Sequence, residues 1–238
     1  MIYHFDTVTS TNDLAREPQY HDGDIVRADF QTAGRGQRGH IWQSQAGQNL
    51  TFSLVLEPKF LPVTEQFMLL EAVALSLTDF FAELGISAAV KWTNDIYVGD
   101  SKAVGILIEH SYSAGCLSRT IVGIGINVNQ TEFAADIPNP ISLALLTGKQ
   151  YELNTLLQQF EHCFTARYQT LKSGEWEAMH RSYNALLYRR DCRATYALPT
   201  GEKFEGTIRE VRPTGELMVE HSDGQKCGYL FKEIEFII

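Results

Sequence analysis

The chain has 238 residues, of which 44% are hydrophobic and 21% are charged, and its formal net charge at pH 7 is −9. This length allows one core of roughly 150 to 200 residues and a small second domain, and the ordinary composition argues against a disordered or fibrous chain. The acidic balance argues against a general nucleic-acid binder, because phosphate contacts need clustered Lys and Arg.

Neither a membrane span nor a secretory signal is visible, so we expect a cytoplasmic protein. The most apolar helical stretch, residues 67–84, contains three acidic residues that would be costly in lipid. The N-terminus has neither the basic nor the long apolar region of a signal peptide. The four cysteines are tens of residues apart, which favours reduced thiols over a disulfide framework or a zinc knuckle.

In chain order, the first helix is expected to begin where Ser10-Thr11-Asn12-Asp13 precedes Leu14-Ala15-Arg16, because these short oxygen-bearing side chains can accept the first unpaired amide protons. Strands are predicted at 24–30 and 50–56, on either side of a polar, glycine-rich connection whose length is typical of functional loops. Apolar residues at helical spacing then predict a helix over 64–84, which Gly85 can end.

Three more strands are predicted at 88–91, 103–110 and 119–127, and two more helices at 154–172 and 176–188. The tail is different, since short apolar runs alternate with turn residues, which predicts hairpins in a small β-barrel. We therefore expect an α+β fold followed by an all-β module, with the boundary near residues 189–191.

The segment Gly34-Arg35-Gly36-Gln37-Arg38-Gly39, here called the glycine-arginine strip, is the densest functional signal. Its glycines permit positive φ and leave backbone amides free to approach an anion. Arg35 and Arg38 supply charge-assisted hydrogen bonds. The spacing also matches a dinucleotide-binding pattern, but the residues that follow lack the helical period which that site requires. A plain surface loop is the remaining alternative.

Two later segments place further polar groups at strand ends. Asp95 and Lys102 are separated by seven residues, so a hairpin would bring them to one site, although an ordinary turn and a solvated edge lysine also explain them. Gly123 and Gly125 lie inside a predicted strand, where glycines weaken packing unless something approaches the backbone closely. A bulge beside a ligand would explain them.

Taken in order, these segments resemble the motifs of the biotin protein ligase family. The matching segments are Ser10-Thr11-Asn12, Gln31-Thr32-Ala33-Gly34-Arg35-Gly36-Gln37-Arg38-Gly39, Lys91-Trp92-Thr93-Asn94-Asp95, Lys102 with Gly105, and Gly123-Ile124-Gly125-Ile126-Asn127. The resemblance spans nearly the whole chain and implies a mixed-sheet catalytic domain, residues 1–189, followed by a small SH3-like β-barrel, residues 190–238. Because the first motif begins at Ser10, we expect the short form without an N-terminal DNA-binding domain.

The resemblance implies an ATP-dependent ligase that forms biotinyl-5′-AMP and then transfers biotin to a lysine of a biotin carboxyl carrier domain. Its catalytic residues would be Lys102, Arg35 and Asp95, with Asp95 as a candidate general base. The biotin-binding residues would be Ser10, Thr11, Asn12, Gln31, Gly34, Arg35, Gly36, Gln37, Lys102 and Gly105. The residues binding ATP or the adenylate would be Arg38, Trp42, Asn94, Asp95, Lys102 and Asn127, with Asn94 and Asp95 as candidate oxygen ligands of Mg²⁺.

Two departures from the family pattern stand out, at Gln37, where arginine is common, and at Thr93, where proline is common. Gln37 lacks the charge of arginine, which predicts a weaker hold on the activated intermediate. The alternatives are a lipoate or octanoate protein ligase and a non-catalytic biotin-binding regulatory module. As partners we expect the carrier protein, no nucleic acid and no membrane, with the chain itself a monomer or homodimer.

Overall fold

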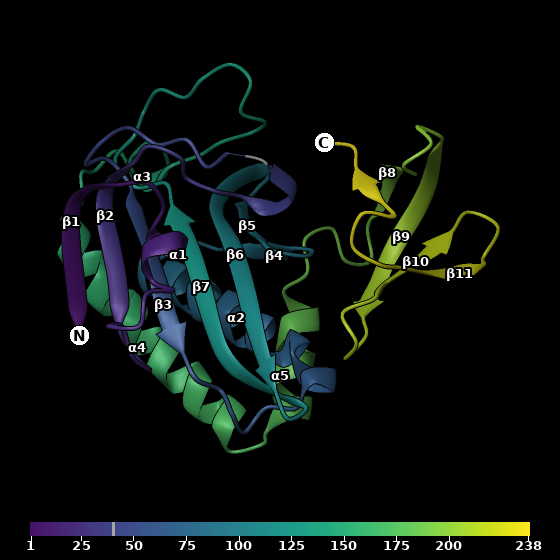
Figure 1. Ribbon diagram of the computed structural model, residues 1–238. Coiled ribbons are helices and arrows are strands. Elements are labelled where there is room, and N and C mark those ends of the chain that lie inside the picture. Colours follow the sequence, from purple (N-terminus) through teal and green to yellow (C-terminus); the bar gives the residue numbers. More distant parts are fainter. Residues whose placement is uncertain (40) are drawn as a thin grey trace.

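The computed structural model describes residues 1–39 and 41–238, except for the side chain of Arg38. A seven-stranded mixed sheet with helices forms the larger part, and the C-terminal residues form a separate five-stranded antiparallel sheet beside it (Figure 1). The fold is therefore α+β with a C-terminal all-β part, as the sequence predicts. Among the described residues, no helix has the length and apolar character needed to span a membrane.

The large sheet has the strand order β1-β2-β3-β7-β6-β5-β4. β1 and β2 are parallel, and the remaining neighbours are antiparallel. All seven residues of the interior strand β3 are buried, because α1 packs on one face and Phe160 of α4 contacts Phe52 on the other. The strands are β1 (Ile2–Val8), β2 (Ile25–Gln31), β3 (Leu50–Leu56), β4 (Ala89–Lys91), β5 (Asp95–Val98), β6 (Ser101–Ser113) and β7 (Cys116–Ile126).

Two long helices pack together against one face of this sheet, and the short α1 lies on the other face (Figure 1). The rings of Phe52, Phe80 and Phe160 meet where the long helices reach β3, with centroids 5.2 and 6.5 Å from that of Phe160, and such aromatic contacts add to the burial of apolar area. The helices are α1 (Thr11–Leu14), α2 (Phe67–Glu83), α3 (Leu143–Thr147), α4 (Leu153–Lys172) and α5 (Trp176–Ala185), with 3-10 turns at Gln37–Gly39 and Val63–Glu65.

The C-terminal sheet is a meander whose last strand returns beside the first, in the order β11-β10-β9-β8-β12. Its strands are β8 (Arg193–Ala197), β9 (Lys203–Val211), β10 (Leu217–His221), β11 (Lys226–Tyr229) and β12 (Glu235–Phe236). The short runs predicted in the tail, at 193–197, 204–211, 216–221 and 226–231, correspond to β8 through β11. The boundary between residues 189 and 190 falls in the connection between α5 and β8 and stays a prediction.

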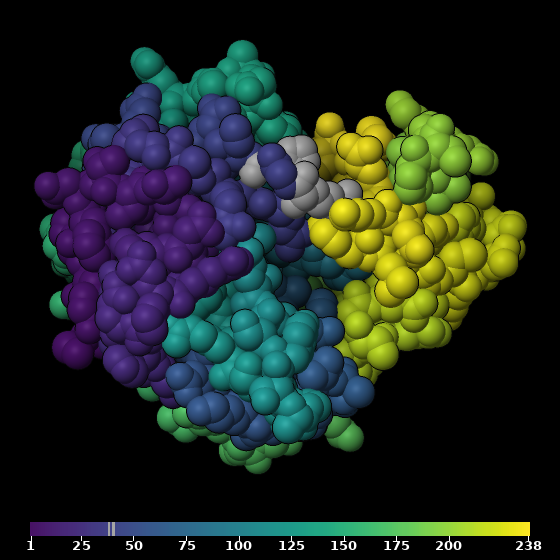
Figure 2. Space-filling model, in the orientation of Figure 1, coloured from purple at the N-terminus to yellow at the C-terminus, as the bar shows by residue number. Residues whose placement is uncertain are grey.

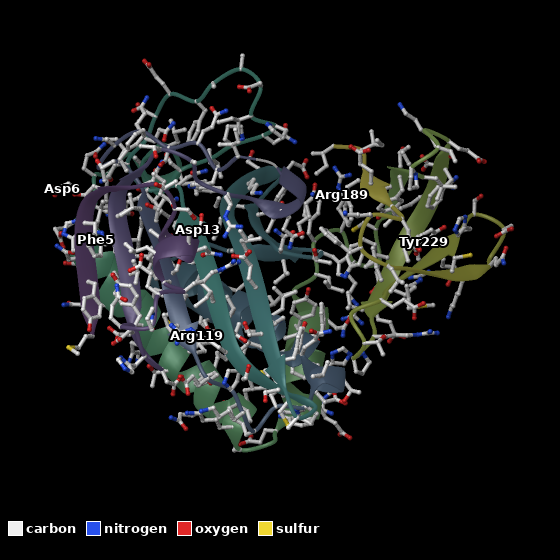
Figure 3. All side chains as sticks on the ribbon, viewed as in Figure 1. Phe5, Asp6, Asp13, Arg119, Arg189 and Tyr229 are labelled. Carbon is white, nitrogen blue, oxygen red and sulfur yellow. The ribbon has the colours of Figure 1, made fainter. Side chains whose placement is uncertain are left out.

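Hydrogen bonds join the C-terminal sheet to the larger part near β4. Trp92 Nε1 donates to the carbonyl of Gly215 at 2.9 Å, and the guanidinium of Arg189, labelled between the two parts in Figure 3, donates to the carbonyl of Ile237 at 3.0 Å. The side chain of Asn184 on α5 bonds both the amide and the carbonyl of Val211 on β9. These contacts bring the C-terminal residues to the edge of the large sheet.

A buried acid-base pair lies beneath this junction, between α2 and α5. Glu71 is fully buried, and its Oε1 lies 2.6 Å from Nδ1 of His180. Burial raises the pKa of the Glu71 carboxyl against the opposing hydrogen bond from His180. The hydrogen bond to Glu71 raises the pKa of the His180 imidazole above its ordinary value of 6.5. Both groups therefore hold protons more tightly in the folded chain than in the unfolded chain.

We expect the free energy of unfolding to fall as the pH rises from about 6 to about 8, because stability decreases with pH where the folded state binds more protons. The contribution of His180 is fully present below pH 6.5 and is lost as the pH rises through the raised pKa. Denaturant unfolding of His180→Gln should show a flatter pH dependence, whereas the exposed His162→Gln on α4 should keep the wild-type slope. Equal slopes for His180→Gln and wild type would contradict this account.

Candidate active site

A pocket of about 930 Å³ opens where β6 and β7 meet the glycine-arginine strip and the C-terminal residues. Figure 2 shows the C-terminal residues lying against the main body, with a hollow between the two parts. The volume is at the upper end of the range for small-molecule sites, which is about 300 to 1,000 Å³. The expected site residues that line it are Ser10, Thr11, Asn12, Gln31, Arg35, Gly36, Gln37, Trp42, Asn94, Asp95, Lys102, Gly105 and Asn127.

One end of the pocket is formed by buried polar side chains from α1 and β2. The amide and hydroxyl of Thr11 donate to Gln31 Oε1 at 2.8 and 3.1 Å. Ser10, in the segment expected to cap the first helix, occupies the N-cap position of α1, but its side chain makes no capping hydrogen bond. The amide of Thr11, the first residue of this single turn, donates to Gln31. Donors and acceptors gathered here suit a small polar ring in an otherwise apolar pocket.

The floor of the pocket is glycine backbone on β6 and β7, covered by one indole ring. Gly105 and Gly125 are register partners, and a Cβ on Gly125 would lie 2.3 Å from the ring of Trp42. A Cβ on Gly123 would similarly lie 2.3 Å from Asn12 Oδ1. The expected bulge is absent here, since the described register between β6 and β7 runs without a shift through these glycines. Close approach by Trp42 and Asn12 explains the glycines instead.

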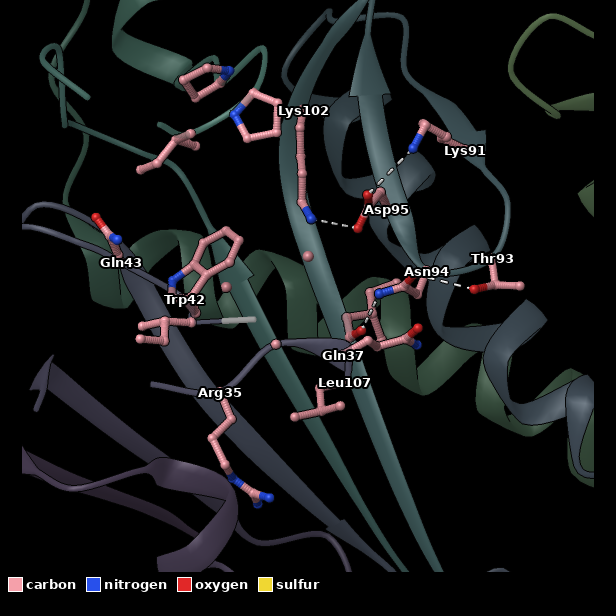
Figure 4. Close-up of a pocket in the computed structure, with 18 of the residues that line it drawn as sticks. Arg35, Gln37, Trp42, Gln43, Lys91, Thr93, Asn94, Asp95, Lys102 and Leu107 are labelled. Carbon is pink, nitrogen blue, oxygen red and sulfur yellow. Dashed lines mark hydrogen bonds and ion pairs between the residues drawn. The ribbon is translucent and has the colours of Figure 1, made fainter. Parts of the chain in front are cut away.

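The other end of the pocket holds a carboxylate between two ammonium groups. Lys102 Nζ lies 2.7 Å from Asp95 Oδ1, and Lys91 Nζ lies 4.0 Å from Asp95 Oδ2 (Figure 4). This confirms that the β5–β6 hairpin brings Asp95 and Lys102 together. Burial lowers the pKa of the Lys91 ammonium, with the charge of Asp95 opposing the shift. The pocket thus has a polar end, an apolar middle and a charged end.

The backbone of Lys102 is fixed by the loop that precedes α3. Its amide donates to the carbonyl of Asn139 at 2.6 Å, and its carbonyl accepts from the amide of Ile141 at 3.0 Å. Residues 136–140 of this loop line the pocket beside Lys102. The loop therefore forms one wall of the charged end.

Comparison with known proteins identifies the family of this chain. The profile of the biotin/lipoate A/B protein ligase family matches residues 3–127, just over half of the chain. This chain belongs to the biotin/lipoate A/B protein ligase family. It is accordingly a ligase.

The relatives of this ligase include proteins named for biotin. It is 37% identical over 245 residues to the bifunctional ligase/repressor BirA of Bacillus subtilis, a match that covers 96% of this chain and 72% of the relative. A match to BirA of Bacillus spizizenii, also 37% identical, covers 71% of this chain and 53% of the relative. The chain thus spans about half to three quarters of the length of these curated relatives. The biotin–[acetyl-CoA-carboxylase] ligase of Mycobacterium tuberculosis is 26% identical over 84% of this chain.

Solved structures agree with this family assignment. Biotin protein ligase from Aquifex aeolicus in complex with biotin and ATP superposes with a TM-score of 0.83 at 26% identity, covering 98% of this chain and 97% of that one. The C-terminal sheet is therefore included in the likeness. The fold class expected from the sequence is confirmed over nearly the full length of the ligase.

Arg35 differs from its expected role as a cation beside the reacting groups. Its guanidinium nitrogens lie 3.1 and 2.8 Å from the two oxygens of Glu109, and one lies 2.8 Å from Asp13. The side chain points away from Lys102 and Asp95 (Figure 4). Because two carboxylates already satisfy this guanidinium, it is not a free cation in this arrangement.

Gly34 of the strip also departs from expectation. Gly34 is not among the described residues that line the pocket; its carbonyl accepts from the amide of Trp42 at 2.9 Å, and a Cβ would lie 2.6 Å from the Trp42 carbonyl. Its role here is to let the strip fold back on itself. The side chain of Arg38, expected to bind the adenylate, lies outside the described residues. Gln37 Oε1 is buried without a hydrogen-bond partner.

The two candidate Mg²⁺ ligands do not form a metal site in this arrangement. Both oxygens of Asp95 face ammonium groups, and the oxygen of Asn94 accepts from the hydroxyl of Thr93 at 3.2 Å. Among the described residues, no cluster of three or more His, Cys, Asp or Glu side chains could hold a metal ion. These residues therefore do not fit a protein-held Mg²⁺.

The C-terminal residues contribute to the pocket, which the sequence does not predict. Phe231 and residues 234–238 line the pocket, and Lys91 Nζ lies 5.0 Å from the centre of the Phe236 ring, a cation–π distance. No local sequence pattern predicts this contact, because Lys91 and Phe236 are 145 positions apart. The pairing of β12 with β8 brings the C-terminal residues to the pocket.

Proposed function

We propose that this ligase condenses biotin with ATP, supplied as its Mg²⁺ complex, to form biotinyl-5′-AMP, and then transfers biotin to a lysine of a biotin carboxyl carrier domain. The observation that carries the proposal is one pocket with Thr11 and Gln31 at a polar end and Lys102 at a charged end. The polar end suits the ureido ring of biotin, and the apolar middle of the pocket, above the glycine floor, suits the hydrocarbon part of biotin. The charged end then receives the carboxylate.

In the first half-reaction, a carboxylate oxygen of biotin attacks the α-phosphorus of ATP, and the bond to the β-phosphate breaks as pyrophosphate leaves. Two like charges about 4 Å apart repel by roughly 4 kcal/mol at an effective dielectric near 20. Lys102 is the cation suited to offset this repulsion, because its Nζ can exchange Asp95 for the incoming oxygens. The loop wall at Asn139 keeps its backbone in place during this exchange.

In the second half-reaction, the carrier lysine attacks the acyl carbon, and AMP leaves. With a pKa near 10.4, only about 0.04% of such amines are neutral at pH 7, so a base that accepts the ammonium proton accelerates the step. Asp95 is the proposed base because it is the carboxylate in this pocket closest to Lys102. Its second oxygen, 4.0 Å from Lys91, is the less tightly paired one.

We also propose the domain bounds and the cellular compartment of this ligase. We assign residues 1–189 to the catalytic domain and residues 190–238 to a small SH3-like domain, whose last residues line part of the pocket. The cytoplasm is the proposed compartment, since it supplies ATP and keeps thiols reduced, and all four cysteines are free.

The test is to incubate the protein with an apo biotin carrier domain, ATP, Mg²⁺ and either biotin, lipoate or octanoate, and to follow the intact mass of the carrier. Gain of one biotinyl group, dependent on ATP, is the expected result. Gain only with lipoate or octanoate would move the ligase to that branch of the family. Biotin binding without any gain would indicate a non-catalytic regulatory module, provided that a known ligase modifies the same carrier.

A further inference from the structure

Glu109, on β6 beyond the pocket, accepts hydrogen bonds from three side chains of two other segments. Its carboxylate accepts hydrogen bonds from Arg35 at 2.8 and 3.1 Å and from Asn12 at 2.8 Å. Arg16, just after α1, also donates to it. Glu109 is not among the described residues that line the pocket, and the proposed reaction gives it no part.

From Glu109 a continuous set of hydrogen bonds leads to the polar end of the pocket. Asn12 is almost fully buried, and its Oδ1 lies 2.6 Å from the hydroxyl of Ser53. That hydroxyl lies 2.8 Å from Thr11 Oγ1, and the backbone amide of Thr11 donates to Gln31 Oε1 at 2.8 Å. The carboxylate therefore connects Arg35 of the glycine-arginine strip with the groups proposed to hold the ureido ring.

An ordinary surface ion pair would contribute little, because exposed pairs are screened and cost side-chain entropy. Glu109 is different, since its side chain is only 23% exposed and one of its donors is the buried Asn12. Burial alone would raise the pKa of the Glu109 carboxyl, but the hydrogen bonds from Asn12 and Arg16 and the charge of Arg35 lower it below its usual value. The carboxylate is thus held in its charged form.

The partners of Arg35 strengthen the same connection. Asp13, on the front of the sheet in Figure 3, lies 2.8 Å from the Arg35 guanidinium and follows Asn12 directly in α1. Arg35 therefore joins α1 through Asp13 and β6 through Glu109. With its guanidinium fixed at both points, the chain at Arg35 has a defined position beside the pocket.

We propose that Glu109 is a positioning residue that fastens the glycine-arginine strip to α1, so that the loop over the pocket and the polar end that receives the substrate ring are ordered as one unit. That this unit binds biotin rests on the proposed function. The connection of the strip to α1 through Glu109 does not depend on which substrate binds. Arg35 then acts through its ion pairs as an anchor of the strip.

The experiment compares Glu109→Gln, which keeps the shape and loses the charge, with wild type and with Asp79→Asn. Asp79 forms a similar two-point pair with Arg167 at 2.6 and 2.9 Å between α2 and α4, away from the pocket. Amide hydrogen exchange is measured in the unliganded proteins, and the Kd for biotin by calorimetry. For Glu109→Gln we expect exchange to accelerate about tenfold both in residues 34–42 and in residues 11–15, and the Kd to rise about tenfold, the size of one lost hydrogen bond to a charged group.

Asp79→Asn should change neither the exchange of these two segments nor the Kd. Unchanged exchange in residues 34–42 of Glu109→Gln, or a change there without one in residues 11–15, would overturn the proposed connection. Because exchange is read without ligand, this outcome is separate from the proposed function, which fails if wild type itself does not bind biotin. A further check is the double variant Glu109→Gln with Arg35→Gln, which should accelerate strip exchange no more than Arg35→Gln alone, since Arg35→Gln already removes the pairs with both Glu109 and Asp13.

Discussion

Lys102→Met is expected to slow the formation of biotinyl-5′-AMP by about 10²- to 10³-fold, the size of removing one preorganised charge or donor from the site where charge develops. Methionine keeps much of the length of the lysine side chain but cannot offset the repulsion between the carboxylate and the α-phosphate. The backbone bonds of residue 102 to Asn139 and Ile141 do not involve the side chain. The loop wall should therefore remain in place, so that the loss reflects chemistry rather than misfolding.

Biotin-dependent exchange of labelled pyrophosphate into ATP measures this first half-reaction without any carrier. Lys172→Met is the matched control, because Lys172 lies at the end of α4 with its ammonium 4.6 Å from the centre of the Tyr168 ring, outside the pocket. It should exchange at the wild-type rate. If Lys102→Met retained near-wild-type exchange, the charge beside the reacting phosphate would have to come from another residue.

Much of the large sheet could be predicted because its strands carry strong apolar runs. The strand at Leu50–Leu56 matches its predicted bounds, and the predicted helix over 64–84 contains all of α2, since β3 is buried throughout and α2 is long and mostly apolar. The strand Ile2–Val8 was missed, because β1 is an edge strand whose polar and exposed residues resemble a loop. The sequence does not predict the strand Asp95–Val98, since it is short and begins at Asp95, which follows Asn94 and is, like it, a typical turn residue.

The candidate site could be predicted as a set of positions but not as a set of contacts. Spacing across a hairpin correctly paired Asp95 with Lys102, because the two residues are close in sequence. No spacing rule links Arg35 with Glu109, which are 74 positions apart, and so the arginine was expected to face the phosphates. Long-range partners of charged side chains depend on how the whole sheet closes, and local patterns carry no information about that.

Asp95→Asn is expected to slow the transfer of biotin from preformed biotinyl-5′-AMP to the carrier by about 10²-fold, within the usual contribution of a general base. The amide cannot accept the proton of the attacking ammonium, although it preserves the shape of the side chain. The same change also removes the ion pair at 2.7 Å that holds Lys102. Formation of the adenylate should therefore slow as well, but to a smaller extent, because the ammonium itself is still present.

Single-turnover transfer separates these two effects. The adenylate is supplied already formed, so the attack of the biotin carboxylate on the α-phosphate, which Lys102 promotes, is bypassed. Lys91→Met offers the internal comparison, since it removes the more distant ammonium, 4.0 Å from Asp95, and leaves the carboxylate in place. If Asp95 acts as the base, Asp95→Asn slows transfer far more than Lys91→Met does. If Asp95 serves only to position Lys102, pyrophosphate exchange falls in Asp95→Asn while the single-turnover transfer rate stays at the wild-type value.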